Sequence, residues 1–162
     1  MRRLLLAVLS LAFLAACQPA TTELTEEQKA AIAAEVNAIH AENGQAWADA
    51  DFDRAMSYFQ NSQDMMFALE GGLMRGWDAM YNALAPYFEG VTRQEMTVAE
   101  THTVVLARDA VSIMAQGTSA YVYESGEVGP ESPFALTLVY VLRDGEWKVA
   151  LGHESLPTPE SM

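Results

Sequence analysis

Basic side chains are scarce in this chain of 162 residues, which carries 9 Lys and Arg against 22 Asp and Glu. The formal net charge is −13 at pH 7. Binding to nucleic acid or to an anionic surface requires a footprint of basic residues that neutralise phosphates. The charge balance therefore argues against both as partners, and the simplest interpretation of the negative charge is solubility.

The chain also lacks an apolar run long enough to cross a bilayer. An apolar stretch over 4–16 follows Arg2 and Arg3 and stops at Cys17. A basic start followed by a short apolar segment is typical of a secretory signal peptide. We therefore predict that residues 1–16 are a signal peptide and not part of the fold.

Cysteine is represented by a single residue, Cys17, directly after that stretch. The motif Leu14-Ala15-Ala16-Cys17 resembles the lipobox of bacterial lipoproteins, in which the cysteine is lipidated and becomes the first residue. The resemblance implies a membrane anchor of several acyl chains, palmitate among them. Gln18 in the next position implies a place in the cell envelope at the outer membrane, facing the periplasm. The alternative is an ordinary signal peptide with a cysteine nearby by chance.

A lipidated Cys17 would leave the mature chain without a thiol, which excludes disulfides, thiolate metal sites and cysteine nucleophiles. Without Arg2 and Arg3, seven basic side chains remain against 22 acidic ones, and the formal net charge becomes −15. The remaining length is sufficient for one domain with a hydrophobic core. We expect a lipidated tether over 17–24, one domain over 25–156 and a tail over 157–162.

The first half of this domain has helical periodicity. Thr25 and Gln28 fit a capping box, which predicts a long helix to about residue 48 with an inward stripe on one face. Asp51 is placed to cap a second, short helix over 52–59. A brief strand over 64–69 precedes a third helix that begins at about residue 77.

The second half alternates between apolar and polar residues with a period of two. This pattern predicts four strands, over 94–106, 110–123, 133–142 and 147–155. Helices followed by an antiparallel meander are typical of the α+β class. We therefore predict an α+β fold.

The Asp144-Gly145 pair predicts a two-residue type I′ turn, which fixes the register of the last hairpin. In that register His153 points into the molecule, opposite Leu136. The other residues predicted on this core face are Leu138, Tyr140, Leu142, Trp147, Val149 and Leu151. The opposite face is only mildly apolar, which suits either a homodimer or a free surface.

The preceding hairpin, closed at 108–109, places Glu100 and His102 on one face. Gly117 and Ser119 share that face, and small or polar residues that point inward are typical of a cavity floor. Because Glu100 and His102 are two residues apart, the carboxylate can orient the imidazole as in catalytic base–orienter pairs. The alternative is a pair of partly solvated edge residues.

The order of these elements resembles the nuclear-transport-factor-2-like superfamily, and within it the SnoaL-like and ketosteroid-isomerase-like proteins. The long first helix carries the resemblance together with ADADFDRAMSYF (48–59), SQDMMFALEGGLMRGWDAM (62–80) and DGEWKVALGHES (144–155). It implies a curved, largely antiparallel sheet wrapped around three N-terminal helices, which forms a cone with an internal pocket. Many members dimerise through the sheet. The family includes isomerases, cyclases, dehydratases, ligand carriers and assembly domains, so the function must be argued from the site.

The isomerase-like members carry a general base near the end of the first strand and a hydroxyl on the first helix. By alignment these positions fall near Leu69 and Asn43, and neither supplies that chemistry. A shift of one residue would bring Glu70 to the position of the base. Without that shift, the departure argues against isomerase-like chemistry.

Histidines are the remaining candidates for chemistry. His153 is either a general acid or base at the pocket mouth or a structural residue. His40, His102 and His153 lack a short metal-ligand spacing, so we expect neither a metal nor a cofactor. Asp64 would either face the pocket or cap a turn. The residues predicted to line the ligand pocket are Trp47, Tyr58, Asp64, Trp77, Tyr81, Glu100, His102, Tyr121, Tyr140 and His153.

Three functions fit these patterns. The first, which we favour, is a domain tethered to the outer membrane through Cys17 whose apolar pocket binds a small hydrophobic molecule. The second is an isomerase, dehydratase or hydrolase that uses His102 with Glu100, or His153. The third is an assembly domain without a functional pocket.

Overall fold

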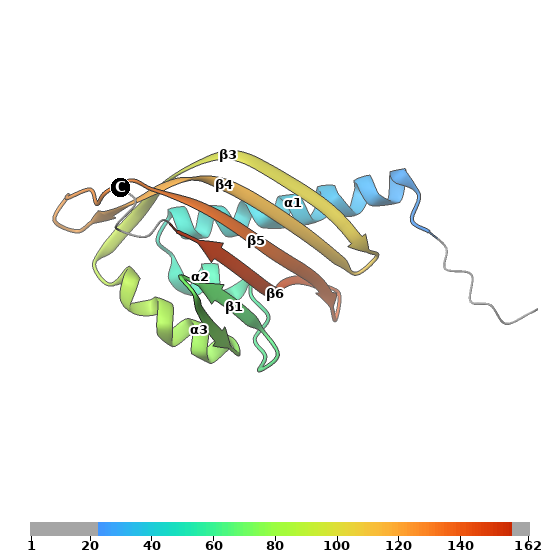
Figure 1. The fold of residues 1–162 in the computed structure, drawn as a ribbon, viewed down its shortest axis with the longest axis horizontal. Coiled ribbons are helices and arrows are strands. Elements are labelled where there is room, and N and C mark those ends of the chain that lie inside the picture. The colour runs from blue at the N-terminus through green and yellow to red at the C-terminus, as the bar shows by residue number, and fades with distance from the viewer. Residues whose placement is uncertain (1–22, 157–162) are drawn as a thin grey trace, which may run out of the picture.

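The computed structural model describes residues 23–156, in which a curved sheet arches over the helices (Figure 1). The predicted signal peptide, Cys17 and the tail over 157–162 lie outside the described residues. Three helices precede the long strands of the sheet: α1 (Glu26–Ala48), α2 (Phe52–Ser57) and α3 (Trp77–Leu84). One short hairpin lies between α2 and α3. The α+β prediction is therefore confirmed. In the described part of the chain, every helix is too short or too polar to cross a membrane.

Helix α1 begins where the capping box predicts. The Thr25 hydroxyl accepts a hydrogen bond from the backbone N–H of Gln28 (3.2 Å), and the Gln28 side chain accepts one from the Thr25 N–H (3.0 Å). Both bonds satisfy donors that the start of a helix leaves unpaired. The predicted stripe packs against the core through Ile32, Val36, Ile39, Asn43 and Trp47.

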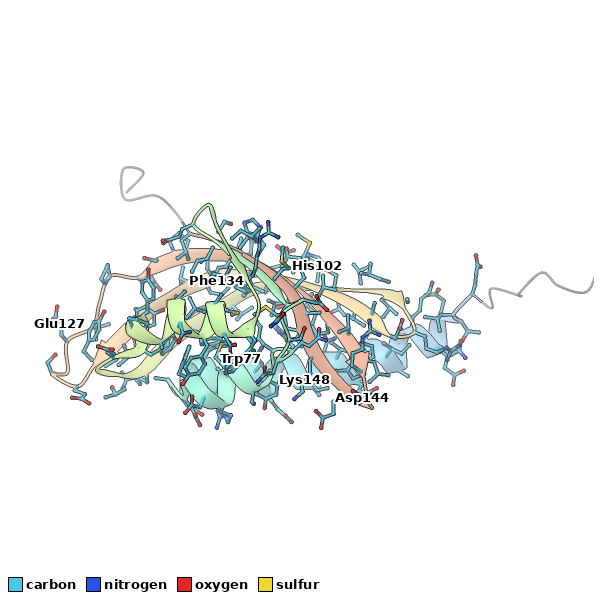
Figure 2. All side chains as sticks on the ribbon, turned by 90° about the horizontal axis from the view of Figure 1, so that it is seen from below. Trp77, His102, Glu127, Phe134, Asp144 and Lys148 are labelled. Atoms are coloured by element: carbon cyan, nitrogen blue, oxygen red, sulfur yellow. The ribbon has the colours of Figure 1, made fainter. Side chains whose placement is uncertain are left out.

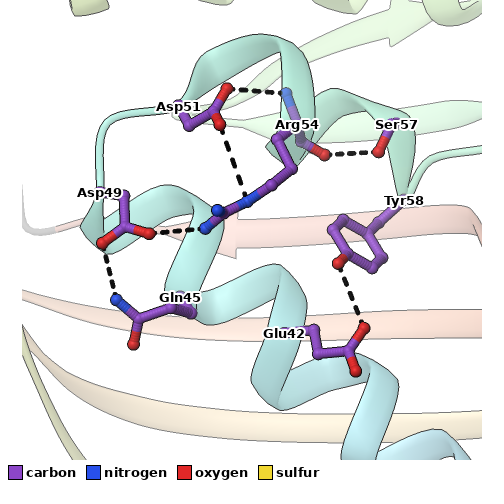
Figure 3. A network of polar contacts seen from close by, with 7 residues as sticks. All are labelled: Glu42, Gln45, Asp49, Asp51, Arg54, Ser57 and Tyr58. Carbon is purple, nitrogen blue, oxygen red and sulfur yellow. Dashed lines mark hydrogen bonds and ion pairs between the residues drawn. The ribbon is translucent and has the colours of Figure 1, made fainter.

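Charged and polar side chains connect the end of α1 to the start of α2 (Figure 3). Asp51 caps α2 by accepting a hydrogen bond from the Arg54 N–H (3.2 Å), although the helix ends at Ser57, earlier than predicted. The Arg54 guanidinium donates to Asp49 at 2.7 Å, and Gln45 donates to the same carboxylate at 2.7 Å. These groups are exposed, so we expect them to orient the helices and to add little stability.

Helix α3 continues into a 3₁₀ helix, η1 (Ala85–Phe88), at the proline that would otherwise end it. The 3₁₀ helix places the Phe88 ring between the helices and the sheet. Its centroid lies 5.4 Å from that of Trp47 and 5.7 Å from that of Tyr121. Aromatic residues from α1, η1 and the sheet therefore meet at one end of the molecule.

The sheet has six strands in the order β2-β1-β6-β5-β4-β3. They are β1 (Met66–Leu69), β2 (Gly72–Arg75), β3 (Val91–Ala107), β4 (Ala110–Tyr123), β5 (Ser132–Arg143) and β6 (Glu146–Ser155). The sequence analysis missed β2, which pairs with β1 through a tight turn at Glu70-Gly71 with positive φ at both residues. Strand β1 pairs in parallel with β6, and the remaining neighbours are antiparallel.

Three register shifts interrupt the pairing of β3 with β4: between Val91 and Arg93, between Val98 and Glu100, and between Val105 and Ala107. Each places an extra residue on β3, which increases the twist and exchanges the faces of the strand. Gly117 lies opposite Val98, where the second shift begins, and an added Cβ there would come 2.0 Å from the Thr97 carbonyl oxygen. Only glycine permits this close approach, which contributes to the curvature of the sheet.

The hydrophobic core fills the space between the concave face of the sheet and the helices. Fully buried side chains from the helices and the sheet meet there, among them Val36, Met56, Met80, Ile113, Tyr140 and Val149. Each large apolar side chain buried in this way contributes about 1.5–3 kcal/mol relative to exposure. Beyond this core the sheet continues toward the loop of Glu127, at the opposite end of the molecule from the Asp144 turn (Figure 2).

Candidate functional site

The last hairpin follows the predicted register only as far as Val149. The turn at 144–145 has the two positive φ angles of type I′. The pair after Val149 joins Val139 to Leu151, which leaves Ala150 as an extra residue on β6. This β-bulge turns every later side chain of the strand to the face opposite the predicted one.

The prediction that His153 points inward opposite Leu136 is therefore wrong. Leu136 pairs with Glu154, and His153 pairs with Thr137 on the outer face, where it is exposed. The physical reason is the bulge, because one extra residue inverts the alternation of a strand. The residue that β6 contributes to the interior at this position is a carboxylic acid.

Leu151 was also predicted in the core, and it is 45% exposed. Gly152 takes its place opposite Leu138. A Cβ at Gly152 would lie 2.4 Å from the Phe67 ring, so this ring of β1 packs directly onto the backbone of β6. Glycine at this position therefore leaves room for the Phe67 ring at the wall of the interior.

A cavity of about 380 Å³ lies between the concave face of the sheet and the end of the helical layer. Its wall is mostly apolar and aromatic, and every layer of the domain contributes to it. Members of the lining are Trp47, Phe59, Phe67, Leu69, Glu70, Met80, Leu84, Phe88, Gln94, Met96, Ser119, Tyr121, Phe134, Leu136, Leu138 and Glu154.

Glu154 brings a carboxyl group into this cavity, between its sheet neighbours Leu136 on β5 and Leu69 on β1. Burial raises the pKa of Glu154 from 4.5 to about 7, and the negative charge of nearby Glu70 adds to the shift. Among the described residues, no hydrogen bond to the carboxylate offsets these effects. The carboxyl group therefore exchanges its proton near neutral pH, which is unusual for glutamate and typical of functional sites.

Other polar groups in the cavity are few. Burial raises the pKa of the Tyr121 hydroxyl to about 12, with a smaller contribution from the negative charge of Glu154. This hydroxyl therefore stays protonated and can donate a hydrogen bond. Gln94, Ser119 and Ser132 add an amide and two hydroxyls to the wall. A mostly apolar enclosure with a few polar groups is the usual form of a small-molecule site.

Glu100 and His102 form the predicted pair, but on the convex face of the sheet. Nε2 of His102 lies 2.7 Å from Oε1 of Glu100, and Gln116 donates to Oε2 of Glu100 at 3.0 Å. The prediction that the pair forms a cavity floor is wrong, because the register shift near the turn of β3 pairs His102 with Met114 and turns it outward. The His102 side chain is 69% exposed.

One shallow hollow of about 350 Å³ on the convex face includes Glu100, His102 and His153. The row across the sheet runs from His102 through Met114 and Thr137 to His153. With a strand spacing of about 4.8 Å, the two imidazoles lie roughly 14 Å apart in the sheet. The structure thus gathers these candidates on one surface without bringing both histidines to a common atom.

Several residues predicted along the pocket lie elsewhere, and their polar ends have structural partners. Tyr58 donates to Glu42 (3.3 Å, Figure 3), Tyr81 to Asp53 (2.7 Å) and Trp77 to the Met56 carbonyl (3.1 Å), while the Tyr140 hydroxyl lies 3.0 Å from Nδ1 of His40. Asp64 is exposed next to Ser62, whose hydroxyl accepts a hydrogen bond from its N–H. From the predicted set, Trp47 and Tyr121 line the cavity.

The three histidines are not brought together. His40 lies inside the domain, where burial lowers its pKa, and the other two lie on the convex face. Within residues 23–156, no cluster of three or more His, Cys, Asp or Glu side chains is arranged to hold a metal ion. The histidines therefore do not form a common site, whereas the carboxyl group of Glu154 lies in the cavity.

The sequence analysis did not name Glu154 as a candidate. Its only signal was a carboxylate beside the predicted inward His153, and nothing in the sequence around Ala150 marks a bulge. The isomerase-like resemblance indicates one position for a base and one for a hydroxyl, and only the position for the base lies at the cavity. Leu69 and Glu70 border the cavity, whereas Asn43 is 1% exposed and lies outside the cavity lining.

Three helices against a concave sheet that encloses a cavity define a cone-shaped α+β domain of the nuclear-transport-factor-2-like class. Residues 36–159 match the SnoaL-like domain, and the chain belongs to this family. No protein of curated function matches the sequence significantly.

Solved structures share this fold at low sequence identity. An NTF2-like superfamily protein from Salmonella enterica serovar Typhimurium is 16% identical with a TM-score of 0.65, over 83% of this chain and 94% of that chain. A ketosteroid isomerase-like protein from Erwinia carotovora atroseptica is 17% identical with a TM-score of 0.64, over 84% and 100%. An NTF-2-like protein of unknown function from Shewanella oneidensis is 22% identical with a TM-score of 0.56, over 75% and 97%.

Proposed function

We propose that this chain is a small-molecule-binding domain whose cavity encloses the apolar body of a ligand while Glu154 contacts its polar group. The observation that carries this proposal is the half-buried carboxyl group without a hydrogen-bond partner among the described residues, inside an apolar cavity of about 380 Å³. Because none of the described residues donates a hydrogen bond to it, this carboxyl group is available to pair with the polar group of a ligand. The volume falls within the range of about 300–1,000 Å³ that small-molecule sites occupy.

A neutral hydrophobic dye tests this proposal without knowledge of the natural ligand. We expect Nile red to bind with enhanced fluorescence and a Kd in the micromolar range. Ser119→Trp, which fills the cavity from β4, should abolish binding. Ser125→Trp in the exposed loop after β4 is the matched control and should leave binding unchanged. Equal binding by both variants, or no binding by the unmodified domain, would reject the cavity as a binding site.

A second candidate function is proton-transfer catalysis by Glu154. A carboxyl group with a pKa of about 7 is suited to act as general acid and general base at neutral pH, and the protonated Tyr121 hydroxyl is a second donor in the same cavity. Native mass spectrometry of protein purified from its own host would identify a bound compound. Catalysis predicts that this compound exchanges hydrogen for deuterium in D₂O with the unmodified protein and not with Glu154→Gln. Equal exchange with both would exclude Glu154 as the catalytic group.

We also propose that acyl chains on Cys17 hold the domain at the outer membrane, facing the periplasm. The support is the sequence alone, namely the motif that ends at Cys17 and the glutamine that follows it. Expression in a Gram-negative host should give a detergent-extracted protein whose mass includes the acyl chains. Cys17→Ser should lose this mass increment and appear in the soluble periplasmic fraction. An unmodified cysteine in the unsubstituted protein would contradict the anchor.

A homodimer through the convex face is the remaining proposal on partners. Its support is a group of large apolar side chains there that are about half exposed: Val104, Leu106, Met114 and Leu151. Burying such a patch would remove apolar surface from water. Light scattering after gel filtration should give twice the mass of one chain, and Met114→Glu should give the mass of one chain. A single-chain mass for the unsubstituted domain at high concentration would reject the dimer.

A further inference from the structure

The charge of the cavity wall is entirely negative. Glu154 and Glu70 both belong to the lining, and among the described residues that form it there is no lysine, arginine or histidine. Leu69, which precedes Glu70, pairs with Glu154 across β1 and β6, so the two acids lie at the same edge of the cavity. An anionic ligand would meet repulsion there, with no cation to offset the cost of its burial.

Much of the remaining wall is aromatic. The rings of Phe59, Trp47, Phe88 and Tyr121 form a connected series, with successive centroids 6.3, 5.4 and 5.7 Å apart. Phe67 and Phe134 extend the aromatic wall on the side of the sheet. The faces of such rings carry partial negative charge and attract organic cations, most strongly when water is excluded.

From these two features we propose that the ligand of this cavity is a hydrophobic organic cation, an amine or quaternary ammonium whose charged nitrogen lies beside Glu154 and whose apolar body lies against the aromatic wall. This inference rests on the proposed binding function and specifies its ligand class. The acidic chain, with a formal net charge of −13, would also attract a cation over distance. The same charges disfavour carboxylates, phosphates and sulfates as ligands.

Binding of a cation requires the ionised form of Glu154, so affinity is coupled to pH. The groups that face this carboxyl are Glu70 at the β1–β2 turn, which disfavours ionisation, and Tyr121 on β4, which stays neutral. Below neutrality Glu154 is mostly protonated, and a cation must displace that proton when it binds. Affinity for a permanently charged ligand should therefore increase as the pH rises through about 7.

Three probes that share one apolar body test the proposal: 1-adamantylamine, 1-adamantanol and adamantane-1-carboxylate. Isothermal titration calorimetry on the full folded domain should show the amine binding at least about tenfold more tightly than the alcohol, about 1.4 kcal/mol. The carboxylate should not bind at millimolar concentration. At about pH 6, the amine should release close to one proton, detected as a dependence of the heat on the ionisation enthalpy of the buffer.

Glu154→Gln should remove the advantage of the amine and leave the affinity for the alcohol unchanged, while Glu127→Gln in the exposed loop should change neither. If Glu154→Gln does not fold, the comparison of the three probes on the unsubstituted domain still decides the matter. Equal binding of amine and alcohol, tighter binding of the carboxylate, or no binding of the amine would each overturn the inference. Nile red separates the two proposals: if it binds in any of those cases, the proposed function survives, and if it does not, both fail.

Discussion

Glu100 and Glu154 lie on opposite faces of the same sheet, in opposite environments. The carboxylate of Glu100 is solvent-exposed, 2.7 Å from His102 and bonded to Gln116. The carboxyl of Glu154 faces an apolar cavity and has no hydrogen-bond partner among the described residues. A glutamate–histidine pair is easily recognised in a sequence, yet water competes for every contact it makes. The isolated acid has no such sequence signature, and its protonation state depends on whatever enters the cavity.

The largest expected effect concerns two neighbouring residues on β4 that face opposite sides. Ile113 is fully buried on the concave face and Met114 is 54% exposed on the convex face. Ile113→Ala should reduce the free energy of unfolding by about 2–5 kcal/mol through lost burial and a new cavity. Met114→Ala should change it by less than about 0.5 kcal/mol. Urea denaturation at low protein concentration measures both, and comparable losses would mean that the convex face is buried in solution.

The next largest effect is a pH-dependent change in stability that arises from Glu154 on the concave face. The pKa of Glu154 is about 7 in the folded domain and near 4.5 when unfolded, so the folded state binds the proton more tightly. Its contribution to stability is unfavourable above both values and disappears below both, amounting to at most about 3 kcal/mol. Glu154→Gln should therefore be more stable than the unsubstituted domain at about pH 8 and nearly equal to it at about pH 4. Denaturation at both pH values tests this.

Glu127→Gln is the matched control for that experiment, because this carboxyl group lies in an exposed loop. Its effect should stay within about 0.5 kcal/mol at either pH. A gain for Glu154→Gln that does not depend on pH would show that the Glu154 carboxyl is solvated, contrary to the cavity described above.

A smaller effect is expected where β6 changes faces. Gly152→Ala forces a Cβ against the Phe67 ring and should cost about 1–3 kcal/mol, since the ring must move from its packed position. Gly44→Ala on α1 meets no atom within 4 Å and should stabilise the domain by up to about 1 kcal/mol. Thermal unfolding should therefore shift in opposite directions for the two variants. A shift in the same direction would show that Phe67 does not pack on β6.

The smallest effect belongs to the convex pair. A double-mutant cycle of His102→Ala and Glu100→Gln should give a coupling energy below about 1 kcal/mol, because both side chains are exposed. Neither substitution should alter Nile red binding to the cavity. A coupling above about 2 kcal/mol, or weaker dye binding, would indicate that the convex face takes part in function after all.

Residues near a strong local signal were predictable from the sequence. The capping box of Thr25 and Gln28 predicts the start of α1, and the Asp144-Gly145 turn predicts the pairing up to Val149. Such signals act over a few residues, so their accuracy decreases with distance along the strand. The class and the curved-sheet family were also predictable, because they depend on the order of elements.

The site was not predictable by the same reasoning. A bulge at Ala150 on β6 and the shifts on β3 are set by contacts with other strands, such as the Phe67 ring on Gly152 and the Thr97 backbone beside Gly117. Beyond a bulge or register shift, the inward and outward faces of a strand are exchanged. Glu154 therefore points inward in place of His153, and His102 points outward. Strand β2 was missed for a related reason, since a short edge strand is specified mainly by the partner that it joins.

The central position of β6 in the sheet has a consequence for the order in which the domain assembles. β6 is the last strand in chain order, and it lies between β5 and the parallel strand β1. The β1–β2 hairpin therefore cannot join the rest of the sheet until β6 has been synthesised, and contacts such as that of Leu69 with Glu154 close a very long loop. We expect the helices and β3–β5 to form first, as an open half-cone. The wall around Glu154 would then close last, so the step that limits folding is the same step that carries this carboxyl group into the cavity.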